Sequence, residues 1–218
     1  MFPERLIAGY RSFLGERFPQ ERSRFARLAE AGQQPEVMVI GCCDSRVSPE
    51  VIFDASPGEL FVARNVANLV PPYAPDGDYH GTSAALEFAV QALKVKHIVI
   101  LGHARCGGIQ AFAEGAAPLS TGDFISKWMT MIAPAAERLG PRNENGEDED
   151  YLGRLERAAI EHSLKNLMTF PYVADRVAAG ELALHGAYFG VATGVLLVRD
   201  PHTGTFVPAA PNAAAAGR

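Results

Sequence analysis

The sequence lacks the features that define several large classes of protein. Its 218 residues include only three cysteines, two of them adjacent, so we expect no disulfide framework. No run of about 18 apolar residues occurs, which predicts no membrane span, and the charged N-terminal segment predicts no signal peptide. Lysine- and arginine-rich runs are absent as well, and a net charge of −5 argues against nucleic acid as a partner. These absences favour a cytoplasmic protein whose thiols are available for metal binding or catalysis.

The composition suits one compact domain with short appendages. Hydrophobic residues make up 48% of the chain and charged residues 21%, which is enough to bury one substantial core. We expect an N-terminal helical arm at residues 1–32, an α/β domain at 33–207 and a flexible tail at 208–218. The acidic run at 144–150 is typical of a solvated loop.

The hydrophobic pattern predicts alternating strands and helices. Residues 3–31 have helical periodicity, which we expect to break near Pro19. Short β-branched runs predict strands at 37–40, 60–63 and 97–101, with a further β-rich stretch at 182–198. Helices are expected at 82–93, 107–112, 128–139 and 152–168. This alternation predicts an α/β fold: an open, mainly parallel β-sheet flanked by helices.

Reactive side chains follow two of the predicted strands. Cys42, Asp44 and Arg46 come directly after the strand at 37–40, and His103 and Cys106 come after the strand at 97–101. In open parallel sheets, functional sites gather at the carboxyl ends of the strands. If the two strands are neighbours, two thiolates and an imidazole converge. Zinc favours that ligand set, and three protein ligands leave a fourth position for water.

The alternation of side chains along extended chain distinguishes the paired cysteines. Cys42, Asp44 and Arg46 should point to one face, and Cys43 to the other. A metal held by Cys42 would therefore lie near a carboxylate and a guanidinium. We assign Cys42 as the ligand and interpret Cys43 as a small buried thiol. Cys106 stands at a predicted helix N-terminus, where the helix dipole favours a thiolate.

Taken together, the two motifs resemble those of one enzyme family. Residues 42–46 (Cys-Cys-Asp-Ser-Arg) resemble the Cys-x-Asp-Ser-Arg motif of β-class carbonic anhydrases, and residues 103–108 resemble their His-x-x-Cys-Gly-Gly. Residues 57–68 are also similar to the family, and residues 69–73 and 163–173 are similar to its plant-type branch. The similarity extends from about Gln33 to Tyr188. Either motif alone would be weak evidence, because buried cysteines are common.

The resemblance implies a zinc enzyme that interconverts carbon dioxide and bicarbonate. It implies Cys42, His103 and Cys106 as the Zn²⁺ ligands, with hydration of carbon dioxide carried out by zinc-bound hydroxide. It also implies Asp44 and Arg46 as the catalytic pair. Arg46 would keep the Asp44 carboxylate ionised and off the metal, through a charge-assisted hydrogen bond.

The resemblance further implies a substrate pocket built across the interface of a homodimer or higher homo-oligomer. Gln33 stands at the position of a glutamine that the family directs toward substrate. Phe61, Val66 and Phe88 stand at apolar pocket positions, and the backbone amide of Gly107 could address a bicarbonate oxygen. Phe88 replaces a tyrosine that is common in the plant-type branch, and this change removes a hydroxyl.

The sequence says less about regulation and proton transfer than about the metal ligands. One branch of the family is inhibited by bicarbonate bound beside a tryptophan, and Val39 occupies that position here, so the resemblance implies the unregulated type. Arg64 belongs to that regulatory site but also fits the shared Arg-Asn-Val-Ala-Asn motif. No histidine stands out as a proton shuttle. We interpret the five outside the predicted ligand set as surface or packing residues: His80, His97, His162, His185 and His202.

Three other functions share part of this sequence pattern. A carbonyl sulfide or carbon disulfide hydrolase could use the same zinc scaffold with every ligand retained. A zinc protein without catalysis would have no need of Asp44 and Arg46 on the ligand face. A cysteine phosphatase or rhodanese would need an arginine six positions after its cysteine, and neither Cys42 nor Cys43 has one.

Overall fold

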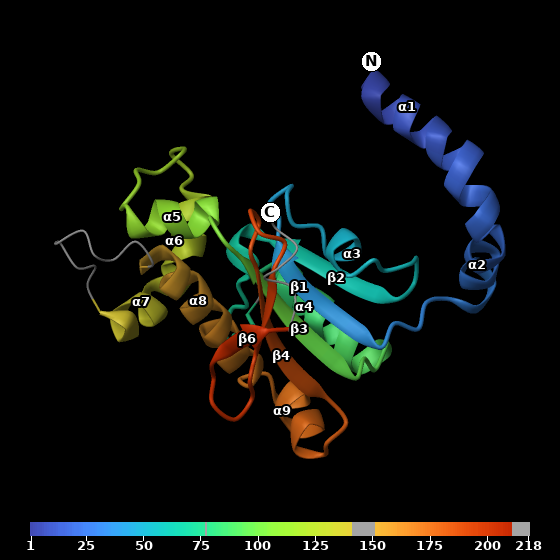
Figure 1. The fold of residues 1–218 in the computed structure, drawn as a ribbon. Coiled ribbons are helices and arrows are strands. Elements are labelled where there is room, and N and C mark those ends of the chain that lie inside the picture. Colours follow the sequence, from blue (N-terminus) through green and yellow to red (C-terminus); the bar gives the residue numbers. More distant parts are fainter. Residues whose placement is uncertain (77, 141–150, 211–218) are drawn as a thin grey trace.

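A six-stranded sheet forms the centre of the molecule (Figure 1). The computed structural model describes residues 1–76, 78–140 and 151–210. The strand order is β2-β1-β3-β4-β5-β6. β1 to β4 are mutually parallel, β5 runs antiparallel to β4, and β6 runs antiparallel to β5. Their bounds are β1 Val37–Cys42, β2 Leu60–Asn65, β3 His97–His103, β4 Ala183–Phe189, β5 Leu196–Arg199 and β6 Phe206–Pro208. The predicted α/β fold with a mainly parallel sheet is confirmed.

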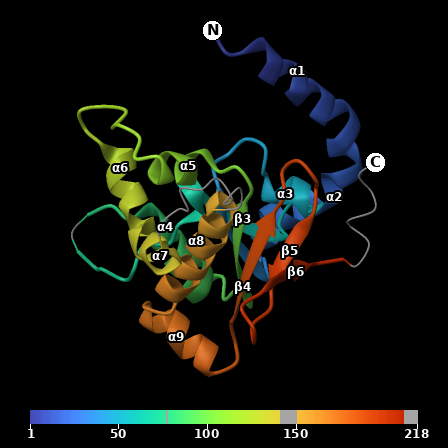
Figure 2. The same ribbon diagram turned by 60° about the vertical axis from the view of Figure 1, so that its left-hand side comes forward.

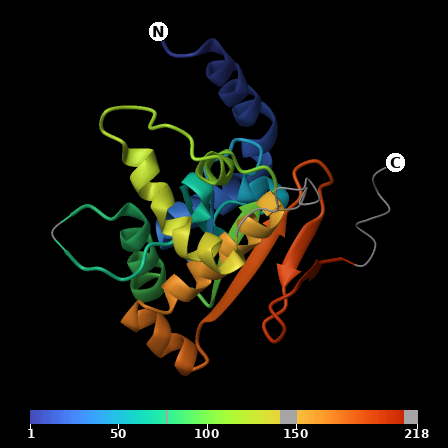
Figure 3. The same cartoon turned by 90° about the vertical axis from the view of Figure 1, so that its left-hand side faces the viewer.

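Helices connect the strands and cover the sheet. Their bounds are α1 Glu4–Ser12, α2 Phe18–Ala31, α3 Pro49–Ile52, α4 Gly81–Glu87, α5 Gly107–Ala113, α6 Phe124–Met129, α7 Ala133–Leu139, α8 Tyr151–Leu167 and α9 Pro171–Ala178. Figures 2 and 3 show α7, α8 and α9 grouped together, with β5 and β6 at the outer edge of the sheet. Within the described ranges, no helix combines the length and the apolar character that crossing a bilayer requires.

Strand alternation decides which side chains enter the core. Met38 and Ile40 of β1, like Ile98 and Ile100 of β3, are fully buried against helices α4, α8 and α9. Val39 points to the opposite face, where a smaller cluster of apolar side chains includes Ile52 of α3. This is the period of two expected for strands covered on both faces.

The N-terminal arm extends away from the body (Figure 1). Neither α1, nor α2, nor the π-helical turn at Phe13–Arg17 between them contains a buried residue. The predicted break near Pro19 is confirmed, because the π-helical turn ends at Arg17 and α2 begins at Phe18 with Pro19 in its first turn. A proline is tolerated there, since the first N–H groups of a helix have no intrahelical acceptor.

Several predictions concern the chain termini and loops. The acidic run at 144–150 and residues 211–218 of the predicted tail lie outside the described residues. The first residues of that tail belong to the sheet, since Pro208 ends β6 and the Ala209 N–H donates to the Leu196 carbonyl over 2.9 Å. The domain bounds at 32 and 207 stay predictions.

Candidate metal centre

The topology brings the two reactive segments together. β1 and β3 are adjacent and parallel, with Gly41 opposite Leu101 in the register. Cys42 therefore ends one strand and His103 ends its neighbour, at the same edge of the sheet. Cys106 follows after a short turn and directly precedes α5. This is the carboxyl edge at which parallel sheets place their sites.

Three potential metal ligands meet at this edge, and we refer to them as the cysteine–histidine cluster (Cys42, His103 and Cys106). A ligand atom from each residue lies within 4.8 Å of the other two. The residues are 5%, 1% and 1% exposed, respectively. The three ligand atoms are therefore close enough to surround a single ion, and the residues that carry them are buried.

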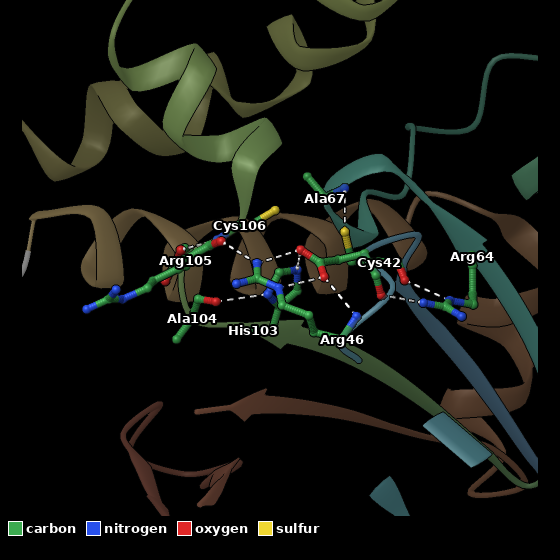
Figure 4. Close-up of polar contacts among 10 residues, drawn as sticks. Cys42, Arg46, Arg64, Ala67, His103, Ala104, Arg105 and Cys106 are labelled. Carbon is green, nitrogen blue, oxygen red and sulfur yellow. Dashed lines mark hydrogen bonds and ion pairs between the residues drawn. The ribbon is translucent and has the colours of Figure 1, made fainter. Parts of the chain in front are cut away.

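The imidazole of His103 provides a test of whether a metal fits. Its Nδ1–H donates to the Ala104 carbonyl over 3.0 Å, which leaves Nε2 as the free acceptor (Figure 4). Nε2 is buried and has no hydrogen-bond partner among the described residues. A buried polar atom without a partner is costly. A bound metal ion would satisfy this nitrogen, and the bond at Nδ1 fixes the tautomer that such a ligand needs.

The thiols already favour one negative charge. A hydrogen bond from the Cys106 thiol lowers the pKa of Cys42 to about 4, and His103 and the Ala67 N–H, 3.4 Å from Sγ, act in the same direction. The bond to Cys42 and then burial raise the pKa of Cys106. One thiolate thus forms at neutral pH within the cluster, and a divalent cation supplies the charge needed to ionise the second. Two thiolates and an imidazole suit Zn²⁺.

Asp44 and Arg46 form a bidentate ion pair beside the cluster. Arg46 Nε donates to Asp44 Oδ1 over 2.9 Å and Nη2 donates to Oδ2 over 2.6 Å. The hydrogen bond from Arg46 holds the pKa of the Asp44 carboxyl well below its usual range. The same carboxylate lies 4.0 Å from Nε2 of His103. The pair therefore presents an ionised oxygen to the space where an ion and its water would lie.

Arg64 has a positioning role that the sequence did not reveal. Its Nε donates to the Cys42 carbonyl over 2.8 Å and its Nη2 donates to the Asp44 carbonyl over 2.7 Å (Figure 4). The guanidinium on β2 thereby fixes the backbone on both sides of Cys43. Sequence reasoning had linked Arg64 only to a shared motif and to the regulatory site of another branch.

Glu156 and Tyr188 were also missed. Glu156 is buried in α8, and its carboxylate accepts the Cys106 N–H over 2.8 Å and the Tyr188 hydroxyl over 2.7 Å. Burial raises the pKa of Glu156, whereas these two bonds act against that change. A glutamate within the apolar stripe of a predicted helix was the available signal, because buried charges need specific partners.

Cys43 does not lie where it was predicted. The structure exposes it, so the interpretation as a buried thiol was wrong. β1 ends at Cys42, and the next backbone N–H, that of Cys43, donates to the Asn65 carbonyl over 2.9 Å at the rim of the sheet. The side chain consequently lines a cavity of about 920 Å³ together with Val66, Trp128 and other residues. Cys42 and Cys43 do face opposite ways, as predicted. Because Cys43 lies past the end of β1, no core side chains cover it.

Two of the predicted substrate residues lie close to the cluster. Gly107 is exposed at the start of α5, next to Cys106. Val66 follows β2, and its backbone carbonyl accepts the Trp128 indole N–H over 2.7 Å. A Cβ at Gly108 would lie only 2.8 Å from a Val66 methyl, so the glycine lets Val66 pack against the start of α5.

The other three predicted substrate residues lie elsewhere in this chain. Phe61 pairs in register with Met38, four positions before the Cys42–Asn65 pair, which corresponds to about 13 Å along the strand. Phe88 packs against Phe61 with ring centroids 5.9 Å apart, and it is 49% exposed. Gln33 is exposed in the loop after α2. The fold of one chain does not bring these side chains to its own cluster.

The remaining histidines lie away from the cluster. His80 Nε2 and Asp76 Oδ1 are 2.6 Å apart near the surface. His97 Nδ1 and His185 Nε2 are 3.1 Å apart on β3 and β4. Burial lowers the pKa of His162 in α8, and His202 is exposed.

Comparison with known proteins gives a consistent result. A family model described as carbonic anhydrase matches residues 37–196. Beta carbonic anhydrase 3 of Arabidopsis thaliana is 36% identical over 195 residues, which cover 88% of this chain and 74% of that protein. The plant origin of this relative agrees with the similarity of residues 69–73 and 163–173 to the plant-type branch.

Solved structures show the same fold. The β-carbonic anhydrase CcaA superposes with a TM-score of 0.87 at 31% identity, covering 95% of this chain and 92% of CcaA. A tetrameric β-carbonic anhydrase from the filamentous ascomycete Sordaria macrospora superposes with a TM-score of 0.77 at 30% identity, covering 94% and 98% of the two chains. On the family match, the plant relative and these structures together, the chain belongs to the β-carbonic anhydrases.

Proposed function

We propose that this protein catalyses the reversible hydration of carbon dioxide to bicarbonate and a proton, with Zn²⁺ as its cofactor. The observation that carries the proposal is the buried cysteine–histidine cluster, beside which Arg46 holds an ionised Asp44 carboxylate 4.0 Å from His103 Nε2. Membership of the family supports the same reaction.

Cys42, His103 and Cys106 would hold the zinc ion. A zinc ion with three protein ligands and an open fourth position activates a water molecule as a nucleophile near neutral pH. The protein chain contributes the buried sulfurs and the His103 nitrogen whose tautomer is fixed by Ala104. The unpartnered Nε2 supports this ligand assignment.

Asp44 orients the attacking water. Its carboxylate accepts a hydrogen bond from that water, so that an oxygen lone pair is directed at the carbon of carbon dioxide. Arg46 occupies both carboxylate oxygens, which keeps Asp44 ionised and prevents it from turning toward the metal. The carboxylate remains an acceptor throughout the neutral range, because its pKa lies far below that range.

The substrate pocket is completed by a second copy of the chain. Val66 supplies an apolar wall beside the cluster, and the Gly107 amide addresses an oxygen of bicarbonate. Gln33, Phe61 and Phe88 serve the neighbouring subunit's site instead. The distance of Phe61 from Cys42 along the sheet and the exposure of Phe88 support this division.

The exposed arm supports a homo-oligomer. The helices of the arm contain no buried residue, yet residues 2–14 include apolar side chains that are 36–64% exposed, namely Phe2, Leu6, Ile7, Tyr10 and Leu14. Apolar surface on this scale is typical of an interface. The Sordaria macrospora relative is tetrameric.

Free cysteines in all three positions support a reducing, cytoplasmic location.

Metal analysis combined with stopped-flow kinetics tests the proposal. The purified protein should contain one zinc ion per chain and hydrate carbon dioxide, and removal of zinc by a chelator should abolish hydration until zinc is restored. Zinc-loaded protein that hydrolyses carbonyl sulfide or carbon disulfide but does not hydrate carbon dioxide would contradict the proposal. So would protein that binds zinc without any turnover.

A further inference from the structure

The Arg105–Cys106 peptide group is held at both ends. Its carbonyl oxygen accepts Arg46 Nη2 over 3.0 Å (Figure 4), and its N–H donates to Glu156 Oε1 over 2.8 Å. One end of this peptide therefore contacts the Asp44–Arg46 pair, and the other contacts a buried carboxylate. Rotation of the peptide plane would break both hydrogen bonds at once.

The backbone at this point needs such restraint. Arg105 has φ of +56°, which is left-handed backbone that side chains with a Cβ seldom adopt. A strained conformation persists only where the surroundings determine it. Arg105 lies between His103 and Cys106, so relaxation of its backbone would move the Cys106 sulfur relative to the His103 nitrogen.

Glu156 is itself fixed from the far side. It is 2% exposed, and its second carboxylate oxygen accepts the hydroxyl of Tyr188 on β4 over 2.7 Å. A buried carboxylate is costly unless it is fully hydrogen-bonded. Its two bonds run to the backbone of the metal-binding turn and to a tyrosine of the central sheet, so this carboxylate connects the turn to the sheet.

We propose that Glu156 and Tyr188 are positioning residues for the metal centre, which fix the Arg105–Cys106 peptide and thereby both the Cys106 sulfur and the Arg46 guanidinium. This inference rests on the proposed function. Neither side chain touches the reacting atoms. They act through Cys106 and Arg46, as outer hydrogen-bond partners of metal ligands do.

The substitution Glu156→Leu removes the acceptor and leaves the Cys106 N–H buried without its carboxylate partner. We expect Glu156→Leu to weaken zinc binding by about 10–100-fold, measured by competition with a chelating dye. The thiolate-to-metal charge-transfer bands of the cobalt-substituted protein should shift as well. Glu156→Gln should stay within about threefold of wild type, because its oxygen can face Cys106 and its amide N–H can face the tyrosine oxygen.

Two further variants separate positioning from folding. Glu161→Leu is the matched control, since Glu161 lies on the same helix and pairs with Arg199 instead; its zinc affinity and cobalt spectrum should be those of wild type. Tyr188→Phe keeps the ring and removes the hydroxyl that donates to Glu156. We expect a smaller loss of zinc affinity from it, which keeps the inference testable if Glu156→Leu does not fold.

The inference and the proposed function fail in different ways. If Glu156→Leu and Tyr188→Phe lower the melting temperature but keep the wild-type zinc affinity and cobalt spectrum, the two residues are only structural and the inference is overturned. If wild-type protein itself binds no zinc or hydrates no carbon dioxide, the proposed function fails regardless of these variants.

Discussion

The metal centre and the proposed substrate pocket differ in how much of each a single chain provides. Cys42, His103 and Cys106 are nearly fully buried, and hydrogen bonds hold the Cys42 carbonyl, the His103 imidazole and the Cys106 N–H. Gln33 and Phe88, by contrast, are exposed and lie away from that cluster. On the proposed function, we therefore expect that the folded single chain binds zinc, whereas turnover requires assembly.

The largest effect should come from the adjacent cysteines, which form a matched pair. Cys42→Ser removes a buried sulfur from the cluster, so zinc affinity should fall by more than the roughly 10–100-fold expected for loss of an outer partner. Cys43→Ser changes an exposed side chain and should leave zinc stoichiometry unchanged. Metal analysis after dialysis measures both. A metal-free Cys43→Ser protein would reverse the ligand assignment.

Asp44→Asn should separate binding from turnover. The amide keeps the size of the side chain but is a weaker acceptor and loses the charge-assisted pair with Arg46. We expect zinc content to be retained and kcat/KM for hydration to fall by roughly 100-fold or more. Stopped-flow assays of zinc-loaded protein test this. Wild-type turnover in the variant would remove Asp44 from the mechanism.

Substitutions in the N-terminal arm should weaken assembly and leave the metal centre intact. Two apolar side chains buried at an interface contribute about 3 kcal/mol or more, so Leu6→Asp combined with Ile7→Asp should weaken assembly by about 100-fold. Activity should fall with assembly while zinc content stays at one ion per chain. Analytical ultracentrifugation and metal analysis measure the two quantities. Full activity in a monomeric variant would show that one chain completes its own pocket.

The smallest expected effect is on the pH dependence of the free energy of unfolding, through a histidine away from the metal centre. Burial lowers the pKa of His185, and the nearby His97 acts in the same direction. Below about pH 6.5 the unfolded chain therefore takes up a proton that the folded state resists, so the free energy of unfolding falls as pH decreases. His185→Asn should reduce the fall in melting temperature between pH 7.5 and pH 5.5. An unchanged slope would show that His185 does not contribute.

The sequence predicted the parts of the site that are local in the chain. Short β-branched runs ending in Gly41 and Gly102 marked β1 and β3, and the alternation of faces distinguished Cys42 from Cys43. The general tendency of free cysteines to be buried gave the wrong prediction for Cys43, which lies just past the end of β1 and is exposed. Pro19 marked the boundary between the two helices of the arm, since a proline is tolerated in the first turn of a helix.

Contacts between distant segments were beyond prediction from the sequence. Glu156 is 50 residues from Cys106 and 32 from Tyr188, and neither spacing marks a contact. α9 and the short strand β6 were missed as well. Pro171 at the start of α9 was an available signal, whereas three residues in β6 are too few to form a pattern.

X-ray absorption at the zinc edge of the wild-type protein near neutral pH tests the central claim most directly. The account predicts two sulfur scatterers at about 2.3 Å and nitrogen or oxygen scatterers at about 2.0–2.2 Å, one of them from imidazole. A spectrum with no sulfur, or with zinc bound only by nitrogen and oxygen, would contradict the assignment of Cys42, His103 and Cys106.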